Sequence, residues 1–75
     1  MDEIRDEDFL ASLGARIKEL RRSAGMSDRD FANTAGISHS QVHRIETGQL
    51  DSRICTLRAI ANTLGITVSE LLKGL

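Results

Sequence analysis

The chain has 75 residues, of which 40% are hydrophobic and 3% aromatic, and its formal charge at pH 7 is −1. A chain this short forms one domain that buries only about 60% of its unfolded surface, so neither a deep substrate cleft nor a dinucleotide-binding fold is expected. A single cysteine excludes a disulfide framework and a multi-cysteine zinc site. No apolar run approaches the roughly 18 residues of a membrane span and the N-terminus does not resemble a targeting peptide, so we expect a cytoplasmic protein with no membrane contact.

Charge is distributed unevenly along the sequence. Residues 1–9 hold five acidic residues and one Arg, whereas residues 10–75 carry 9 Lys and Arg against 6 Asp and Glu, a net charge of +3. We therefore divide the chain into an acidic leader, residues 1–9, and a mildly basic domain, residues 10–75. Many Leu, Ala, Arg and Glu residues and the lack of proline favour an all-α domain.

An amphipathic helix is predicted from about residue 6 or 8 to residue 24. Its apolar residues have the i, i+3, i+4 spacing of a helix that buries one face, and they are Leu10, Leu13, Ile17, Leu20 and Ala24. Arg21 falls on the same stripe, where an unpaired charge would be costly. Arg21 therefore needs an acidic partner elsewhere in the fold.

Two short helices are predicted next, each with a serine as its N-cap. The first runs from Ser27 to Ala35 and the second from Ser38 to Thr47. On the second helix the apolar side contains Val42 and Ile45, and Glu46 lies at its edge as the expected partner of Arg21. The opposite side carries a polar stripe about 140° wide that consists of His39, Ser40, His43, Arg44 and Thr47.

The rest of the chain predicts a loop and two more helices. Residues 49–53 form the loop, and a fourth amphipathic helix runs from about residue 54 to Gly65, with Ile54, Leu57, Ile60, Ala61 and Leu64 on its apolar side. Cys55 flanks these positions and is predicted to be a small buried residue. Thr67 and Glu70 have the spacing of a capping box, so a short fifth helix is expected before the end of the sequence.

The segment from Asp28 to Thr47 predicts a helix-turn-helix. Gly36 supplies the positive φ that a tight turn requires, and Ala32 is small where two helices must cross closely. Two short helices in this arrangement form a stiff platform whose polar face is narrow enough to enter the DNA major groove.

The sequence resembles the phage-repressor/Cro-type (Xre-type) helix-turn-helix family. The matching stretches are LGARIKELRRSAGMS, DFANTAGIS, VHRIETGQ and LRAIANTLGITVSELL, which together cover about residues 13–72. The resemblance implies a compact five-helix, lambda-repressor-like domain that binds double-stranded DNA as a homodimer and regulates transcription. It also implies an internal ion pair at the positions of Arg21 and Glu46.

The resemblance further implies which residues contact the operator. Its base-reading positions match His39, Ser40 and Arg44, and its phosphate-contacting positions match Ser27, Asp28, Ser38 and Gln49. Arg29 and Arg53 lie nearest these positions in the sequence and are the best further phosphate candidates, while His43 shares the polar stripe and is assigned a positioning role. The other basic residues, including Arg16 and Arg22, are predicted to be solvated surface charges.

Two departures from the family pattern keep a second function open. The family usually has Gln where this chain has Asp28, which places a negative charge near the DNA backbone, and Asp51 occupies a loop that commonly contains Pro. An alternative function is therefore a protein-interaction or antitoxin module that binds a second protein partner, with secondary or no DNA binding. The acidic leader could pair with a basic partner of this kind.

Other readings of single residues are weaker. His39 and His43 have the i, i+4 spacing of metal ligands, but no third ligand lies on the same stripe, so no metal or other cofactor is expected. No nucleophile–base pair is visible, so no enzymatic activity is expected. Val68, Leu72 and Leu75 are candidates for a dimer seam, because the last helix is too short to bury all its apolar surface alone.

Overall fold

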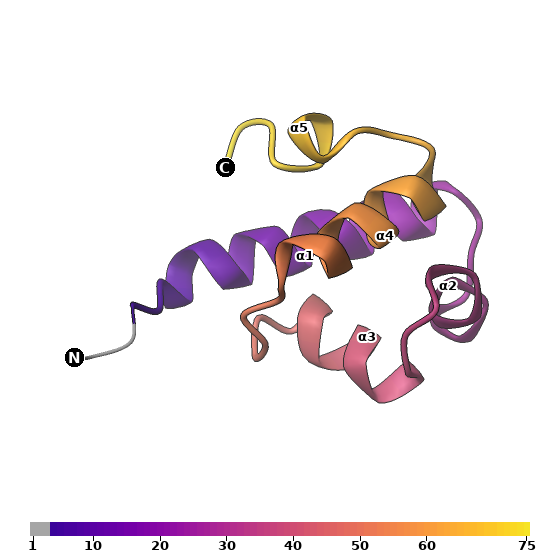
Figure 1. Cartoon of the computed structure of the whole chain (residues 1–75), viewed down its shortest axis with the longest axis horizontal. Helices are drawn as coiled ribbons and strands as arrows, with labels where there is room; N and C mark the ends of the chain where they lie inside the picture. The colour runs from indigo at the N-terminus through magenta and orange to yellow at the C-terminus, as the bar shows by residue number, and fades with distance from the viewer. Residues whose placement is uncertain (1–3) are drawn as a thin grey trace.

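The computed structural model describes residues 4–75, and within this range it contains five α-helices and no strand. In chain order the helices are α1 (Glu7–Ser23), α2 (Asp28–Ala35), α3 (His39–Glu46), α4 (Ile54–Leu64) and α5 (Val68–Leu71) (Figure 1). The all-α prediction and the order of the five predicted helices are thus confirmed. No helix in this part of the chain is long and apolar enough to cross a membrane.

Side chains cap the helices where the sequence predicts it. The hydroxyl oxygens of Ser27, Ser38 and Thr67 accept backbone N–H groups in the first turns of α2, α3 and α5, respectively. Thr67 and Glu70 form a complete capping box. Each cap satisfies a donor that the start of a helix leaves unpaired, so these starts are set by local sequence.

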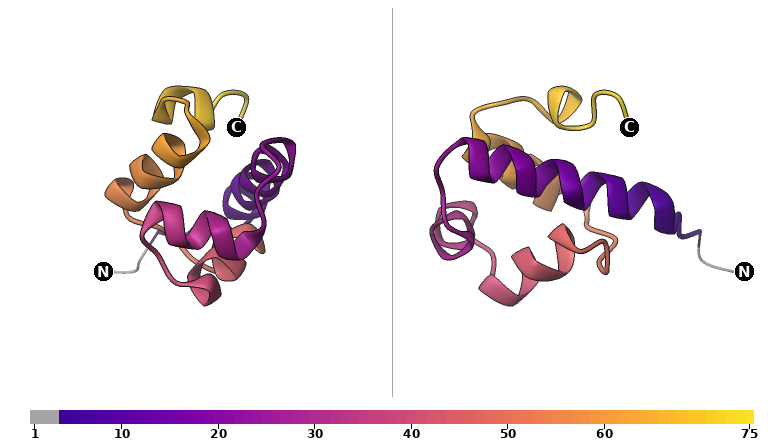
Figure 2. Two further views of the ribbon diagram at one scale, coloured as in Figure 1. Left: turned by 90° about the vertical axis from the view of Figure 1, so that its right-hand side faces the viewer. Right: turned by 180° about the vertical axis from the view of Figure 1, so that it is seen from behind.

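The core lies where α1, α2, α3 and α4 meet. Helix α1 packs against α3, α2 packs against both α3 and α4, and α4 packs against α5. The most deeply buried side chains come from different helices and are Ile17, Phe31, Val42, Ile60 and Leu71. Helix α5 lies on the opposite side of the fold from α3, with α1 and α4 between them (Figures 1 and 2).

Helix α1 approaches the end of α3 closely at a glycine that the sequence analysis did not single out. A Cβ atom added to Gly14 would lie 2.5 Å from the carbonyl oxygen of Ile45 and 2.6 Å from that of Glu46. Both neighbours are backbone atoms, so they have little freedom to move away. Gly48 makes a similar approach to α1, with the added Cβ 2.9 Å from Cα of Ala11. These two glycines let the α1 and α3 backbones come together.

Three sequence predictions about burial are wrong. Ile54 is 64% exposed and Cys55 is exposed; both lie in the first turn of α4, before Leu57, the first buried residue of that helix. Ala24 is also exposed, because it follows the last residue of α1 as its C-cap. The helical repeat of apolar residues therefore continues beyond the surface that a neighbouring helix covers.

Arg16 is also not a free surface charge. Its Nε donates to the carbonyl oxygen of Leu71, and its Nη2 donates to that of Glu70, each over 2.7 Å. Positive charge is favourable at the C-terminus of a helix, where carbonyl groups lack partners. Arg16 therefore ties the short helix α5 to α1.

The predicted boundary between leader and domain falls inside the first turn of α1. Residues 7–9 are helical, and Asp6 is the N-cap, accepting from the backbone N–H of Phe9. The Arg5 guanidinium donates to the carbonyl oxygen of Gln49 over 2.7 Å, so this part of the leader reaches the loop after α3. Residues 1–3 of the leader lie outside the described residues.

Candidate nucleic-acid interface

Helices α2 and α3 form the predicted helix-turn-helix. Gly36 ends α2 with φ of 77°, in the left-handed region that favours glycine. Ala32 is 2% exposed, and the backbone N–H groups of Gly36 and Ile37 both donate to its carbonyl oxygen. The turn is therefore held by two hydrogen bonds, and the start of α3 has a defined position relative to α2.

The polar stripe of α3 faces away from the core. Val42 and Ile45, on the inner side, are 1% and 4% exposed. The residues predicted for the stripe are all exposed, namely His39, Ser40, His43, Arg44 and Thr47. Because packing from the inner side holds α3 in place, its outer face presents two histidines and one arginine on a rigid element.

The helix-turn-helix contains two helix N-termini, one at the start of α2 and one at the start of α3. Ser27 Oγ accepts from the N–H of Asp30 over 3.1 Å, and Ser38 Oγ accepts from that of Gln41 over 3.0 Å. Both serines are exposed. The partial positive charge of a helix N-terminus favours an anion such as phosphate. These are the two serines that the family resemblance assigns to phosphate contacts.

Asp28 does not stand as a lone negative charge on this surface. Its Oδ2 lies 2.8 Å from Nε2 of His39, so the first residues of α2 and α3 form a pair. The hydrogen bond from His39 holds the pKa of the Asp28 carboxyl below its ordinary value of 3.8, and Arg21 adds a smaller attraction. The sequence analysis treated the two residues separately, so this contact was missed.

The structure brings Arg21 and Glu46 together in an ion pair. Arg21 Nε donates to one carboxylate oxygen of Glu46 over 2.7 Å, and Nη2 donates to the other over 3.0 Å. The two side chains are 10% and 7% exposed. Arg21 Nη1 also donates to the Met26 carbonyl oxygen over 2.9 Å. The hydrogen bond to Glu46 is the main reason that the pKa of Arg21 is raised above its ordinary value.

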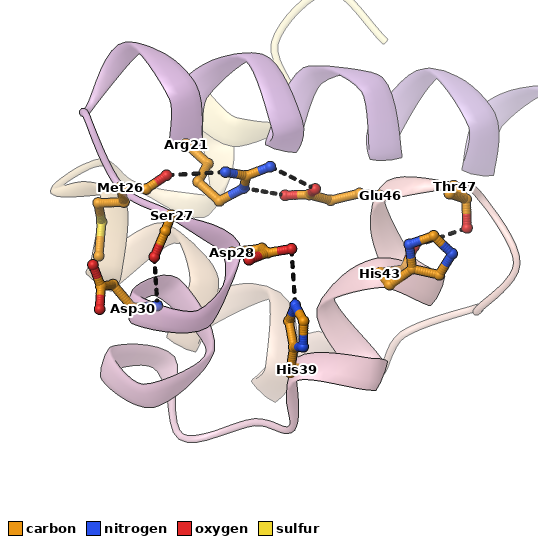
Figure 3. A network of polar contacts seen from close by, with 9 residues as sticks. All are labelled: Arg21, Met26, Ser27, Asp28, Asp30, His39, His43, Glu46 and Thr47. Carbon is orange, nitrogen blue, oxygen red and sulfur yellow. Dashed lines mark hydrogen bonds and ion pairs between the residues drawn. The ribbon is translucent and has the colours of Figure 1, made fainter.

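These two pairs form one line, in which the charges of Glu46, Arg21 and Asp28 alternate and His39 is the last member (Figure 3). Glu46 holds Arg21, Arg21 attracts Asp28, and Asp28 holds His39. The line runs from the buried end of α3, across α1 and α2, to the exposed start of α3. It therefore fixes both ends of α3 against the other helices.

The remaining residues predicted to contact DNA lie in the loop after α3, at the start of α4 and on α2 and α3. The backbone N–H of Gln49 donates to the carbonyl oxygen of Arg44 over 2.8 Å, and its side-chain Nε2 donates to Thr47 Oγ1 over 2.8 Å. Arg53 is the N-cap residue of α4, without a side-chain capping bond, and it lines a shallow hollow with Gln41. Arg29 and Arg44 are exposed, and their guanidinium groups make no hydrogen bond or ion pair within residues 4–75.

The predicted dimer-seam residues lie at separate places. Val68 lines an apolar hollow with Ile54, Cys55 and Arg58, whereas Leu75 lines another hollow beside Phe9. Leu72 is partly buried against the core. Among residues 4–75 no group of three or more His, Cys, Asp or Glu is arranged to hold a metal ion.

Comparison with known proteins identifies the fold and its relatives. Residues 12–73 match a family model described as a helix-turn-helix domain. The chain is 39% identical over 59 residues to the HTH-type transcriptional regulator DdrOP3 of Deinococcus deserti, covering 79% of this chain and 46% of that protein. It is 33% identical over 60 residues to the immunity repressor protein of Bacillus phage phi105, covering 80% of this chain and 42% of that protein. The chain thus spans less than half of these curated relatives.

Solved structures of other proteins share the fold of this chain. The restriction-modification controller protein C.AhdI from Aeromonas hydrophila superposes with a TM-score of 0.81 at 32% identity, covering 83% of this chain and 94% of that one. A chain of the SinR protein/SinI protein complex superposes with a TM-score of 0.77 at 30% identity, covering 83% of this chain and 61% of that one.

Proposed function

The chain belongs to the helix-turn-helix family of the Cro and phage-repressor type, and on that premise we propose that it is a transcriptional regulator that binds operator DNA as a homodimer. The single observation that carries this proposal is the outer face of α3. It is polar, exposed and basic, while Val42 and Ile45 anchor its inner face in the core. A helix of this width fits the major groove of B-form DNA.

Base reading falls to the first turns of α3. His39, Ser40 and Arg44 project from one side of the helix, and Arg44 has no partner within residues 4–75 that would compete with DNA. Arg44 can donate two hydrogen bonds to O6 and N7 of guanine, which is worth about 1–3 kcal/mol of discrimination against other bases.

Phosphate contacts would set the position of the domain on the duplex. Ser27 and Ser38 place helix N-termini at the starts of α2 and α3, and Gln49 holds the loop after α3. Arg29 and Arg53 add positive charge, and His43 extends the polar face. Asp28 acts through His39 rather than as a free carboxylate, which removes part of the repulsion that its charge would cause.

A homodimer would bring two copies of α3 into successive major grooves about 34 Å apart, so the operator would be an inverted repeat with half-sites one helical turn apart. Apolar side chains that the fold leaves partly or fully exposed support such a dimer. Val68 and Leu72 of the predicted seam are partly exposed, and Val68 lines a hollow with the exposed Ile54. Leu75 lies beside Phe9 instead, so its share of the seam is smaller.

The test is selection from a random-sequence duplex library, followed by titration of the enriched DNA at several salt concentrations. We expect an inverted repeat whose affinity falls steeply with salt. Arg44→Ala should weaken binding and relax the preference at one base pair of each half-site. Lys18→Ala removes the same charge from an exposed site on α1 and serves as the matched control. The proposal would be contradicted if no DNA sequence were enriched, or if both variants lost the same amount of DNA affinity.

A second candidate is a protein-interaction module. It is favoured by the similarity to a chain of the SinR protein/SinI protein complex, and by the five acidic residues of the leader. Co-purification with a basic partner, combined with no selection from the DNA library, would favour this function over operator binding.

A further inference from the structure

Resting on the DNA-binding function proposed above, we infer that Asp28 is a positioning residue that makes base reading by His39 depend on a proton. Neutral His39 would accept a hydrogen bond from the amino group of adenine or cytosine. Protonated His39 would instead donate one to the acceptor edge of guanine. The base preferred at this operator position would therefore change with pH.

The argument begins with the geometry of the pair. Asp28 Oδ2 and His39 Nε2 are 2.8 Å apart, and each side chain is about half exposed, at 51% and 50%. An ionised carboxylate only accepts hydrogen bonds, so Nε2 must carry the proton that is shared with it. In a neutral imidazole the other nitrogen, Nδ1, is then an acceptor.

The carboxylate stays ionised in its surroundings. The hydrogen bond from His39, the N–H of Arg29 and the attraction of Arg21 all lower the pKa of Asp28. Arg21 itself is held by Glu46, so the cation that stabilises Asp28 is fixed on α1. Besides His39, the charged and titratable residues of α2 and α3 are Asp28, Arg29, Asp30, His43, Arg44 and Glu46. From α1, Arg21 pairs with Glu46 and attracts Asp28.

The remaining nitrogen of His39 is available to a ligand. Within residues 4–75, Nδ1 of His39 makes no hydrogen bond, and the residue is exposed at the start of α3. Figure 3 shows the imidazole with one nitrogen directed at Asp28 and the other turned away from it. Asp28 thus keeps a proton on Nε2. Whether Nδ1 accepts or donates a hydrogen bond then depends on the protonation state of the ring.

The hydrogen-bonding groups of the bases make the protonation state of His39 determine which base it prefers. In the major groove, adenine N6 and cytosine N4 present donors, whereas guanine N7 and O6 present acceptors. Histidine is the side chain whose charge normally changes between pH 5 and 8. Losing or gaining one hydrogen bond at a base edge should change the preference for that base about threefold to tenfold.

The experiment is the same library selection performed at pH 5.5 and at pH 8.0. For the wild type, one position in each half-site should change from adenine or cytosine at pH 8.0 to guanine at pH 5.5. His39→Gln should select the same base at both pH values. His43→Gln is the matched control, because it removes the only other histidine in the sequence and should lower affinity while keeping the pH-dependent position.

The role of Asp28 has its own readout. Asn can present either a donor or an acceptor to the ring, so Asp28→Asn should allow both preferences at pH 8.0. In the free protein, ¹⁵N chemical shifts of His39 should show the proton on Nε2 in the wild type at pH 8.0 and a mixture of tautomers in Asp28→Asn. A proton on Nδ1 in the wild type would overturn the inference without any DNA.

The outcomes separate this inference from the proposed function. Selection of one operator with the same bases at both pH values would overturn the inference and leave operator binding intact. A pH-dependent position that survives in His39→Gln would also overturn it. Absence of selection at both pH values would overturn the proposed function and this inference together.

Discussion

Removing Glu46 tests the line of alternating charge at its buried end. In Glu46→Ala, Arg21 loses both hydrogen bonds to the Glu46 carboxylate and keeps only the one to the Met26 carbonyl oxygen. Its side chain is 10% exposed, so water replaces little of what is lost. Breaking a buried pair by deleting one partner costs about 3–5 kcal/mol.

That loss is large for a domain of this size. At about 0.05–0.15 kcal/mol per residue, a chain of 75 residues has a total stability of about 4–11 kcal/mol. A loss of 3 kcal/mol lowers the melting temperature by at least about 12 °C in a small domain. Thermal unfolding followed by circular dichroism measures this directly. The control is Glu19→Ala, which removes a glutamate from an exposed position of α1.

A double variant separates burial of charge from loss of packing. Arg21→Met/Glu46→Leu removes both charges and fills much of their volume, so it should be more stable than Glu46→Ala. DNA binding by Glu46→Ala should return at temperatures low enough to refold it. If Glu46→Ala melted within about 2 °C of the wild type, the pair would contribute little and the reasoning would be wrong.

Three further predictions follow from particular contacts. Gly14→Ala should destabilise the fold by about 1–3 kcal/mol, because its Cβ would lie 2.5 Å from a backbone oxygen, whereas Ser12→Ala at an exposed position of α1 should change urea unfolding by less than about 0.5 kcal/mol. Thr67→Ala should cost about 1 kcal/mol by breaking the capping box of α5, and an unchanged urea midpoint would contradict this. Because the pKa of Asp28 is below 3.8 in the folded state, its stabilising contribution should be present above that value and lost as pH falls through the lower native pKa, so Asp28→Asn should flatten the acid limb of stability against pH.

Local sequence patterns predicted most of the secondary structure. Ser27, Ser38 and Thr67 start helices through contacts with residues three positions ahead. Such contacts form within one turn and do not depend on the rest of the fold. The pairing of Arg21 with Glu46 was also predictable, because a charge on each apolar stripe needs a partner and few candidates were present.

Contacts between helices were harder to predict. Asp28 was expected to be a charge facing DNA, although it pairs with His39. Arg16 was expected to be solvated, although it binds the end of α5. In both cases the partner is on another helix, and only the crossing of the two helices brings the atoms within hydrogen-bond distance. Gly14 was missed for the same reason, since its importance lies in the α3 backbone that faces it.

The sequence by itself therefore determined the helices, their caps and the polar face of α3, because these follow from the period of the α-helix and from contacts within one turn. Only the tertiary structure decided that Ile54 and Cys55 are exposed and that His39 is held by Asp28. Burial and pairing depend on where one helix ends against its neighbour. That position is set by packing of the whole core, which a one-dimensional pattern does not contain.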